Sequence, residues 1–165
     1  MDQPTTTAEK SRNRLSEITV DTKSLGRSNS NVEHEREVAI FDILDGNSFS
    51  VEGLDAGPYK LNLAMGEERL LLSITTAAGD ETVEHSASLT PLKKIVKDYF
   101  MICESYYEAV RTAPPARIQA IDVSRRALHR EGSDTLREKL LPKIVVDEDT
   151  ARRLFTLVCS LHWKG

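Results

Sequence analysis

Residues 91–110 read PLKKIVKDYFMICESYYEAV, and this stretch decides how we interpret the second half of the chain. Pro91 suits the first position of a helix, and Thr90 before it is a residue type that caps helices. Large apolar residues then recur at helical spacing on one side: Leu92, Ile95, Val96, Tyr99, Cys103, Tyr106 and Val110. We therefore predict a long amphipathic helix whose apolar side packs against a sheet.

The charges of this predicted helix oppose its dipole. Lys93, Lys94 and Lys97 lie near the positive end, and Glu104 and Glu108 lie near the negative end. Each exposed charge in such a position costs about 0.3–1 kcal/mol. The three lysines are interpreted first as a solvated face, which is usual for runs of charge, and Lys93, Lys94 and Lys97 are kept as a candidate surface for an anion or a partner. A glycine-rich phosphate loop does not precede the helix in the sequence, so nucleotide binding is not indicated.

The middle of the chain has the alternating pattern of β-strands. Three segments at 59–64, 69–76 and 82–88 are separated by turns at Gly66 and Gly79, which predicts an antiparallel meander with one face toward the core. The segment 70–72 is Leu-Leu-Leu, so we expect the central strand here, covered on both sides. Residues 15–20 and 143–146 are candidates for additional edge strands.

Four further helices are predicted around this sheet. A helix at 32–44 follows Asn31 as its cap, with Gly46 beyond its end. The others are a helix at 116–130 ended by Gly132, a short helix from Ser133 to before Pro142, and a last helix at 148–162 capped by Asp147. The predicted fold class is α+β: a small antiparallel sheet with four to five helices, in one domain at 13–165 after a disordered tail at 1–12.

Composition favours a cytoplasmic protein. The 165 residues contain no charge-free apolar run of the length of a membrane span, and the first 30 lack the apolar block of a signal peptide. The two cysteines, Cys103 and Cys159, lie in apolar helical patterns and are interpreted as reduced thiols. Charge is uneven: residues 1–110 carry 19 acidic and 11 basic side chains, net −8, whereas residues 111–165 carry seven acidic and 11 basic, net +4. The basic half could bind anions or pair with the acidic half.

Five motifs together resemble a known family. They are EHEREVAIFDIL (33–44), GPYKLNL (57–63), SLTPLKKIVKDYFMICESYYEAV (88–110), IDVSRRALHREGS (121–133) and DTARRLFTLVCSLHWKG (149–165). As a set they resemble a family of small uncharacterised bacterial proteins, from about Leu15 to Gly165. That family usually has Gly where this chain has Ser124 and Ala127, and Asn at Arg130. The resemblance implies a bacterial cytoplasmic protein and no catalytic residue or cofactor.

Arg125, Arg126 and His129 form the main candidate site in the basic half. On a helix with Ile118, Ile121 and Leu128 buried, Arg125 falls within the apolar side. A buried arginine needs a partner because its charge is permanent. The alternatives are an internal ion pair, for example with Asp122 at i−3, or a pocket in which the two arginines and His129 bind a carboxylate or phosphate.

Enzyme-type chemistry is not indicated by the sequence. Cys103 lies in an apolar stripe and has no glycine-flanked elbow, and the four histidines lie in separate elements without metal-ligand spacing. No catalytic residue, metal or cofactor is therefore predicted. The favoured function is a non-catalytic binding or regulatory module with a protein partner. A small-anion binder or enzyme using the arginine pair, and weak nucleic-acid binding by the basic C-terminal helices, remain the alternatives; the oligomeric state is left open.

Overall fold

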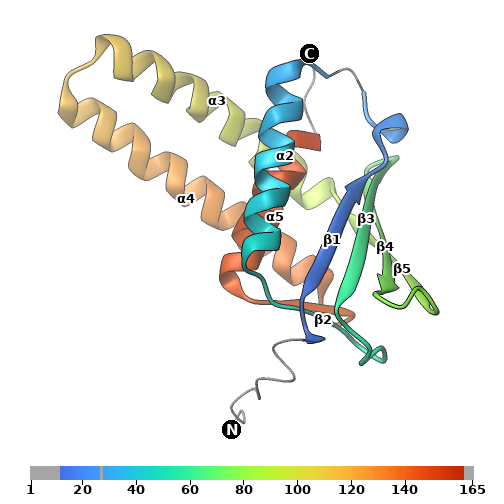
Figure 1. The fold of residues 1–165 in the computed structure, drawn as a ribbon. Coiled ribbons are helices and arrows are strands. Elements are labelled where there is room, and N and C mark those ends of the chain that lie inside the picture. Colours follow the sequence, from blue (N-terminus) through green and yellow to red (C-terminus); the bar gives the residue numbers. More distant parts are fainter. Residues whose placement is uncertain (1–11, 27, 162–165) are drawn as a thin grey trace, which may run out of the picture.

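The central sheet is mixed and has four strands in the order β1-β3-β4-β5. The structure, a computed structural model, describes residues 12–26 and 28–161 (Figure 1). β3 (Tyr59–Gly66), β4 (Arg69–Thr76) and β5 (Thr82–Ser88) form the predicted antiparallel meander. β1 (Leu15–Val20) is an edge strand as predicted, but it runs parallel to β3. Its partner is more than 40 positions away in the sequence, so alternation alone does not specify the direction of pairing.

Only one face of the sheet is buried. Leu61, Leu63 and Ile74 alternate onto that face and are at most 1% exposed. Leu71 of β4 points to the opposite face and is 41% exposed. The prediction that the central strand is covered on both sides is therefore wrong, because the consecutive leucines at 70–72 alternate between a packed face and an open one.

Two helices, α2 (Ser30–Asp45) and α5 (Glu148–Leu161), pack against each other on the buried side of the sheet (Figure 1). α5 is the centre of the core, and its Leu154, Phe155 and Val158 are at most 3% exposed. Asp147 caps α5 as predicted, since its Oδ1 accepts a hydrogen bond from the backbone N–H of Thr150 at 2.8 Å. This cap fixes the start of α5 relative to the strand that precedes it.

The start of α2 differs from the prediction by two residues. Asn29 rather than Asn31 is the cap, and its Oδ1 accepts a hydrogen bond from the backbone N–H of Val32 at 2.9 Å. A small second sheet joins the ends of α2 and α5: β2 (Phe49–Val51) pairs antiparallel with β6 (Ile144–Val146). The strand predicted at 143–146 therefore exists. β2, which is also three residues long, was not predicted. A short 3₁₀ helix, η1 (Thr22–Ser24), follows β1.

The long predicted helix is α3 (Thr90–Thr112), but it does not lie along the sheet. It pairs with α4 (Pro115–Leu140) in a hairpin that projects from the body (Figure 1). Only its first turns, through Leu92 and Val96, enter the main core. Leu89 occupies the cap position without a side-chain hydrogen bond, so Thr90 is the first helical residue and not the cap. The packing prediction was wrong because the apolar side of α3 is wide enough to contact α4 as well as the core.

The helix predicted to stop at Gly132 continues to Leu140 as a single α4. Gly132 is buried in the helix interior, and a Cβ atom there would lie 2.2 Å from the Phe155 ring. Ser133 does not cap a new helix: its hydroxyl donates to the backbone carbonyl of His129 at 2.8 Å, one turn earlier. The glycine thus allows close approach of α4 and α5 rather than ending a helix.

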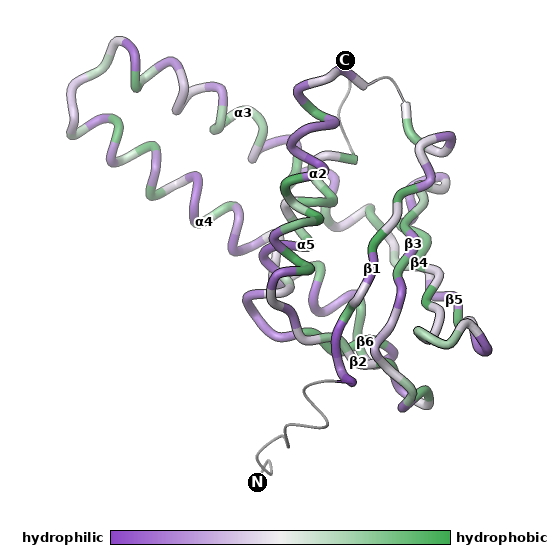
Figure 2. Tube along the Cα trace, in the orientation of Figure 1, coloured by the Kyte–Doolittle hydropathy of each residue, from purple (hydrophilic) through white to green (hydrophobic). Residues whose placement is uncertain are grey.

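Within the described residues, the two sheets and four α-helices confirm the α+β class. Figure 2 shows that apolar residues recur along both helices of the hairpin out to its far end. Among these, Met101 and Val110 of α3 are 58% and 53% exposed. The tail predicted at 1–12 lies outside the described residues except for Arg12. Within 12–26 and 28–161, the helices are too short or too polar to cross a membrane.

Candidate functional site

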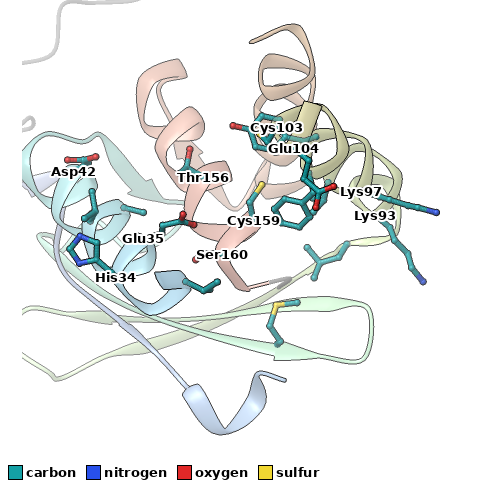
Figure 3. A pocket seen from close by; sticks show the side chains of 18 of the residues that line it. His34, Glu35, Asp42, Lys93, Lys97, Cys103, Glu104, Thr156, Cys159 and Ser160 are labelled. Atoms are coloured by element: carbon teal, nitrogen blue, oxygen red, sulfur yellow. The ribbon is translucent and has the colours of Figure 1, made fainter. Parts of the chain in front are cut away.

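A large cavity lies in a groove between α2 and α3, which we call the α2–α3 groove (Figure 3). It has a volume of about 1130 Å³. α2 packs on α5 and α3 packs on α4, so the facing sides of α2 and α3 form its walls and α5 forms its floor. The apolar or weakly polar lining comes from four elements: Val32, Val38 and Ala39 of α2, Met65 of β3, Val96, Tyr99, Phe100, Cys103 and Tyr107 of α3, and Thr156, Cys159 and Ser160 of α5.

The walls of the groove carry acidic groups without a cationic partner. Among the described residues, Glu35 and Asp42 of α2 and Glu104 of α3 make neither an ion pair nor a side-chain hydrogen bond. In Figure 3, Glu35 and Glu104 reach toward the cavity from opposite walls. Glu35 also acts electrostatically across the groove, because its charge contributes to raising the pKa of the Cys103 thiol. The groove therefore combines an apolar interior with a negative potential.

The three predicted lysines have different surroundings. Lys93 lies at the end of the groove and forms an ion pair with Glu68 at 3.2 Å. Lys94 pairs with Asp98 on its own helix at 3.5 Å. Lys97 lines the groove without an ion pair to any described residue. The side chains of Lys93 and Lys97 extend away from the cavity (Figure 3), so these lysines mark its rim and not its interior.

The thiols in the groove are not prepared for nucleophilic chemistry. Burial raises the pKa of Cys103 and of Cys159 above the ordinary value of 9.0. Burial also raises the pKa of the Tyr99 hydroxyl, which is hydrogen-bonded to Cys103. All three groups therefore stay protonated near neutral pH, and a reactive cysteine requires the opposite shift. Within the described residues, no group of three or more His, Cys, Asp or Glu side chains is arranged to hold a metal ion.

Arg125, Arg126 and His129 do meet in space, beside a second cavity between α4 and α5. Arg125 binds Asp122 through Nη2 at 2.6 Å and Nε at 3.2 Å, which is the i−3 pair that the spacing suggested. Its guanidinium carbon also lies 4.1 Å from the centre of the Tyr106 ring. These two contacts place Arg125 in the interface of the α3–α4 hairpin.

His129 is held in a fixed orientation inside that interface. Its ring contacts Tyr99 and Phe155 edge-on, with centroid distances of 5.4 Å and 5.1 Å. Nε2 lies 2.8 Å from the hydroxyl of Thr156, which itself donates to the carbonyl of Arg152. With the Thr156 hydroxyl donating to Arg152, the tautomer that fits this contact has the proton on Nε2 and donates a hydrogen bond to Thr156. Burial, followed by the charges of Arg152 and Arg125, lowers the pKa of His129, so the ring is neutral at pH 7.

Sequence reasoning missed the acidic wall of the groove and one buried arginine. Glu35 and Asp42 were not singled out, because acidic residues on a helix surface usually face solvent and only the position of α3 gives them a common cavity. Arg36 is 7% exposed, and its Nε has no hydrogen-bond partner among the described residues. Its position one turn from Val32 and from Ala39 on the apolar side of α2 was the available signal.

Comparison with known proteins finds one family model that matches this chain and several similar bacterial proteins. The profile of the uncharacterised protein family UPF0262 matches residues 12–164. A UPF0262 protein of Rhizobium etli (strain CIAT 652) is 55% identical over 152 residues, covering 92% of this chain and 96% of the relative. A UPF0262 protein of Brucella anthropi is 57% identical over 153 residues, covering 92% of this chain and 95% of the relative.

A third relative, from Brucella canis, is 56% identical over 160 residues and covers 96% of this chain and 99% of its own length. No solved structure matches the chain. The family match over nearly all of the sequence and these high identities agree with the resemblance carried by the five sequence motifs. The chain therefore belongs to the bacterial uncharacterised protein family UPF0262.

Proposed function

We propose that this protein is a non-catalytic cytoplasmic binding module whose α2–α3 groove receives an amphipathic helix, with basic side chains, from a partner protein. The observation that carries the proposal is the combination of a largely apolar interior and carboxylates that lack an ion pair among the described residues, in one open cavity of about 1130 Å³. A reduced cytoplasmic location is supported by the two free thiols in apolar surroundings.

The shape of the groove favours a helix as its occupant. α2 and α3 flank α5 without packing on each other, which leaves the position of a further helix between them. Helices pack at interaxial distances of 8–10 Å through apolar side chains. The groove offers such side chains at its surface: Tyr107 is 64% exposed and Val38 is 44% exposed. An amphipathic partner helix would cover them with its apolar face.

The charges of the groove favour a basic partner. Glu35, Asp42 and Glu104 lack cations within the described chain, and only Lys97 offers an unpaired positive charge at the rim. Lysine or arginine on the polar face of the bound helix would pair with these carboxylates on both walls. Such rim charges select the partner and speed its association more than they add affinity.

The non-catalytic assignment is supported by the protonated state of the polar groups in the groove. Burial raises the pKa values of both thiols, so neither is a ready nucleophile at neutral pH. A nucleophile paired with a general base, which acyl-transfer enzymes require, is not found among the described groove residues.

Site-specific photocrosslinking in the native bacterium tests the proposal. A benzophenone side chain at position 107 faces the groove, whereas one at position 123 is the matched control, because Val123 is 53% exposed and does not line the groove. We expect adducts at position 107 whose crosslinked segment, identified by mass spectrometry, is an amphipathic helix with basic residues. Adducts of equal yield at position 123, or a crosslinked segment from a second copy of this chain, would refute it.

A further inference from the structure

The second cavity, of about 730 Å³, lies between α4 and α5 and has a strongly cationic lining; we call it the arginine cavity. Arg125, Arg126 and Arg130 of α4 meet Arg152 of α5 there, beside His129. The lining contains no aspartate or glutamate. Its residues therefore present one sign of charge to anything that enters.

One of these arginines is fully engaged within the protein. Arg125 binds Asp122 through two nitrogens and stacks on Tyr106, and its side chain is only 28% exposed. Asp122 is thereby held on the surface of its own helix, α4. Arg125 thus positions the wall of the cavity and offers little to a ligand.

The other three guanidinium groups are exposed, and among the described residues each makes one ion pair but no hydrogen bond. Arg126 Nε lies 3.2 Å from Asp122, but without the geometry of a hydrogen bond. Arg130 and Arg152 approach Glu148 and Asp149 only to 3.9 Å and 3.8 Å. No guanidinium of the three donates a hydrogen bond to any described residue. Each group has five N–H donors in a planar fork that fits the oxygens of an anion.

The pKa of His129 responds to the positive charges around the arginine cavity. After burial, the two contributions that lower its pKa are the charges of Arg152 and Arg125. The charges of Arg152 and Arg125 therefore reach the His129 ring, which lines the same cavity. A neutral His129 leaves the binding of an anion to the arginines.

We infer that Arg126, Arg130 and Arg152 form a binding site for the phosphoryl groups of a small polyphosphate anion. A carboxylate has two oxygens and one charge, whereas a terminal phosphoryl group presents three oxygens and about two charges to three arginine forks. The cavity volume lies within the range of sites that hold small molecules. This inference does not depend on the α2–α3 groove.

Isothermal titration calorimetry on the full chain tests the site, with pyrophosphate as the probe. Malonate, a dianion with carboxylates, is the chemical control, and ADP shows whether a nucleoside adds affinity to the shared phosphoryl chemistry. We expect pyrophosphate to bind at least tenfold more tightly than malonate. If ADP binds with an affinity within about threefold of that of pyrophosphate, the site recognises the phosphoryl groups alone. If ADP binds more than threefold more tightly than pyrophosphate, the phosphoryl groups that the site recognises belong to a nucleotide.

The double variant Arg126→Ala/Arg152→Ala is expected to weaken pyrophosphate binding at least tenfold. Both side chains are exposed on helices, so the variant keeps its fold, which circular dichroism checks. Arg111→Ala/Arg117→Ala is the matched control: it removes the same two positive charges, and neither residue lines the cavity. The inference would be overturned if the control variant lost as much pyrophosphate affinity as the double variant, or if malonate bound as tightly as pyrophosphate. It would also be overturned if pyrophosphate did not bind measurably, or if a single-stranded oligonucleotide bound more tightly than pyrophosphate.

Discussion

Gly132 lies inside α4 where the helix crosses α5, and the substitution Gly132→Ala tests how closely the two helices must pack. Helix propensity alone predicts that alanine stabilises the protein by about 1 kcal/mol. The structure predicts the opposite result. The new Cβ would lie 2.2 Å and 2.3 Å from two carbons of the Phe155 ring, whereas ordinary contacts begin at 3.4 Å. The ring is fully buried, so it cannot move by the required distance of more than 1 Å without disturbing its neighbours.

Overpacking of a core costs about 1–3 kcal/mol and sometimes more. Because this contact is far inside the van der Waals limit, we expect a net loss of about 2 kcal/mol in the free energy of unfolding. For a chain of this length that is a decrease of about 4–8 °C in Tm. Urea unfolding followed by circular dichroism measures the effect. Gly46→Ala is the control, since nothing lies within 4 Å of a Cβ there and the change should stay within about 0.5 kcal/mol.

A double-mutant cycle separates the clash from other effects. Phe155→Leu alone should destabilise the protein by leaving a cavity, but in its presence Gly132→Ala should cost less than in the wild type. A Gly132→Ala protein that is more stable than the wild type would show that α4 and α5 are not packed as described, and would refute the reasoning.

Three further predictions concern the hairpin and the groove. Burial and the neighbouring arginines lower the pKa of His129 below 6.5, so in acid the unfolded chain binds more protons than the folded protein. The free energy of unfolding should therefore fall as the pH decreases below about 6.5. In thermal melts, the stability of the His129→Gln variant should depend less on pH in this range. Arg125→Lys should lower the free energy of unfolding in urea by about 1 kcal/mol. Lysine keeps the charge, but it loses the two-nitrogen contact with Asp122 and the stacking on Tyr106. A variant as stable as the wild type would contradict these contacts. Because burial raises the pKa values of Cys103 and Cys159, iodoacetamide at pH 7.5 should alkylate them at least tenfold more slowly in the folded protein than in urea. Mass spectrometry measures the rates. Rapid modification of Cys159 in the folded protein would show that this side chain is not buried.

Local patterns in the sequence predicted most of the elements, with β2 and the continuity of α4 across Gly132 as exceptions, but not the partners of these elements. The alternation at 59–64, 69–76 and 82–88 predicted the meander, and the periodicity at 91–110 predicted α3. An apolar stripe shows that a helix is buried against something, and it does not say against what. The hairpin with α4 and the parallel pairing of β1 both depend on contacts between distant segments, which a single sequence does not specify.

The same limit applies to the candidate sites. Arg125, Arg126 and His129 could be grouped from the sequence because they lie within two turns of one helix. Arg152 is on another helix and joins them only through the approach of α4 to α5 that Gly132 allows. Glu35 lines the groove only because α3 lies opposite α2, and the sequence of α2 alone does not specify this arrangement.

The most direct test of the α2–α3 groove is the affinity of two amphipathic peptides of about 18 residues, with the same apolar face and either lysine or glutamate on the polar face. Fluorescence anisotropy should show the lysine peptide binding at least tenfold more tightly, which corresponds to about 1.4 kcal/mol. Glu35→Gln/Glu104→Gln should remove most of that difference, whereas Glu108→Gln, outside the groove lining, should leave it unchanged. Equal affinity for the two peptides, or no binding of either, would contradict the account.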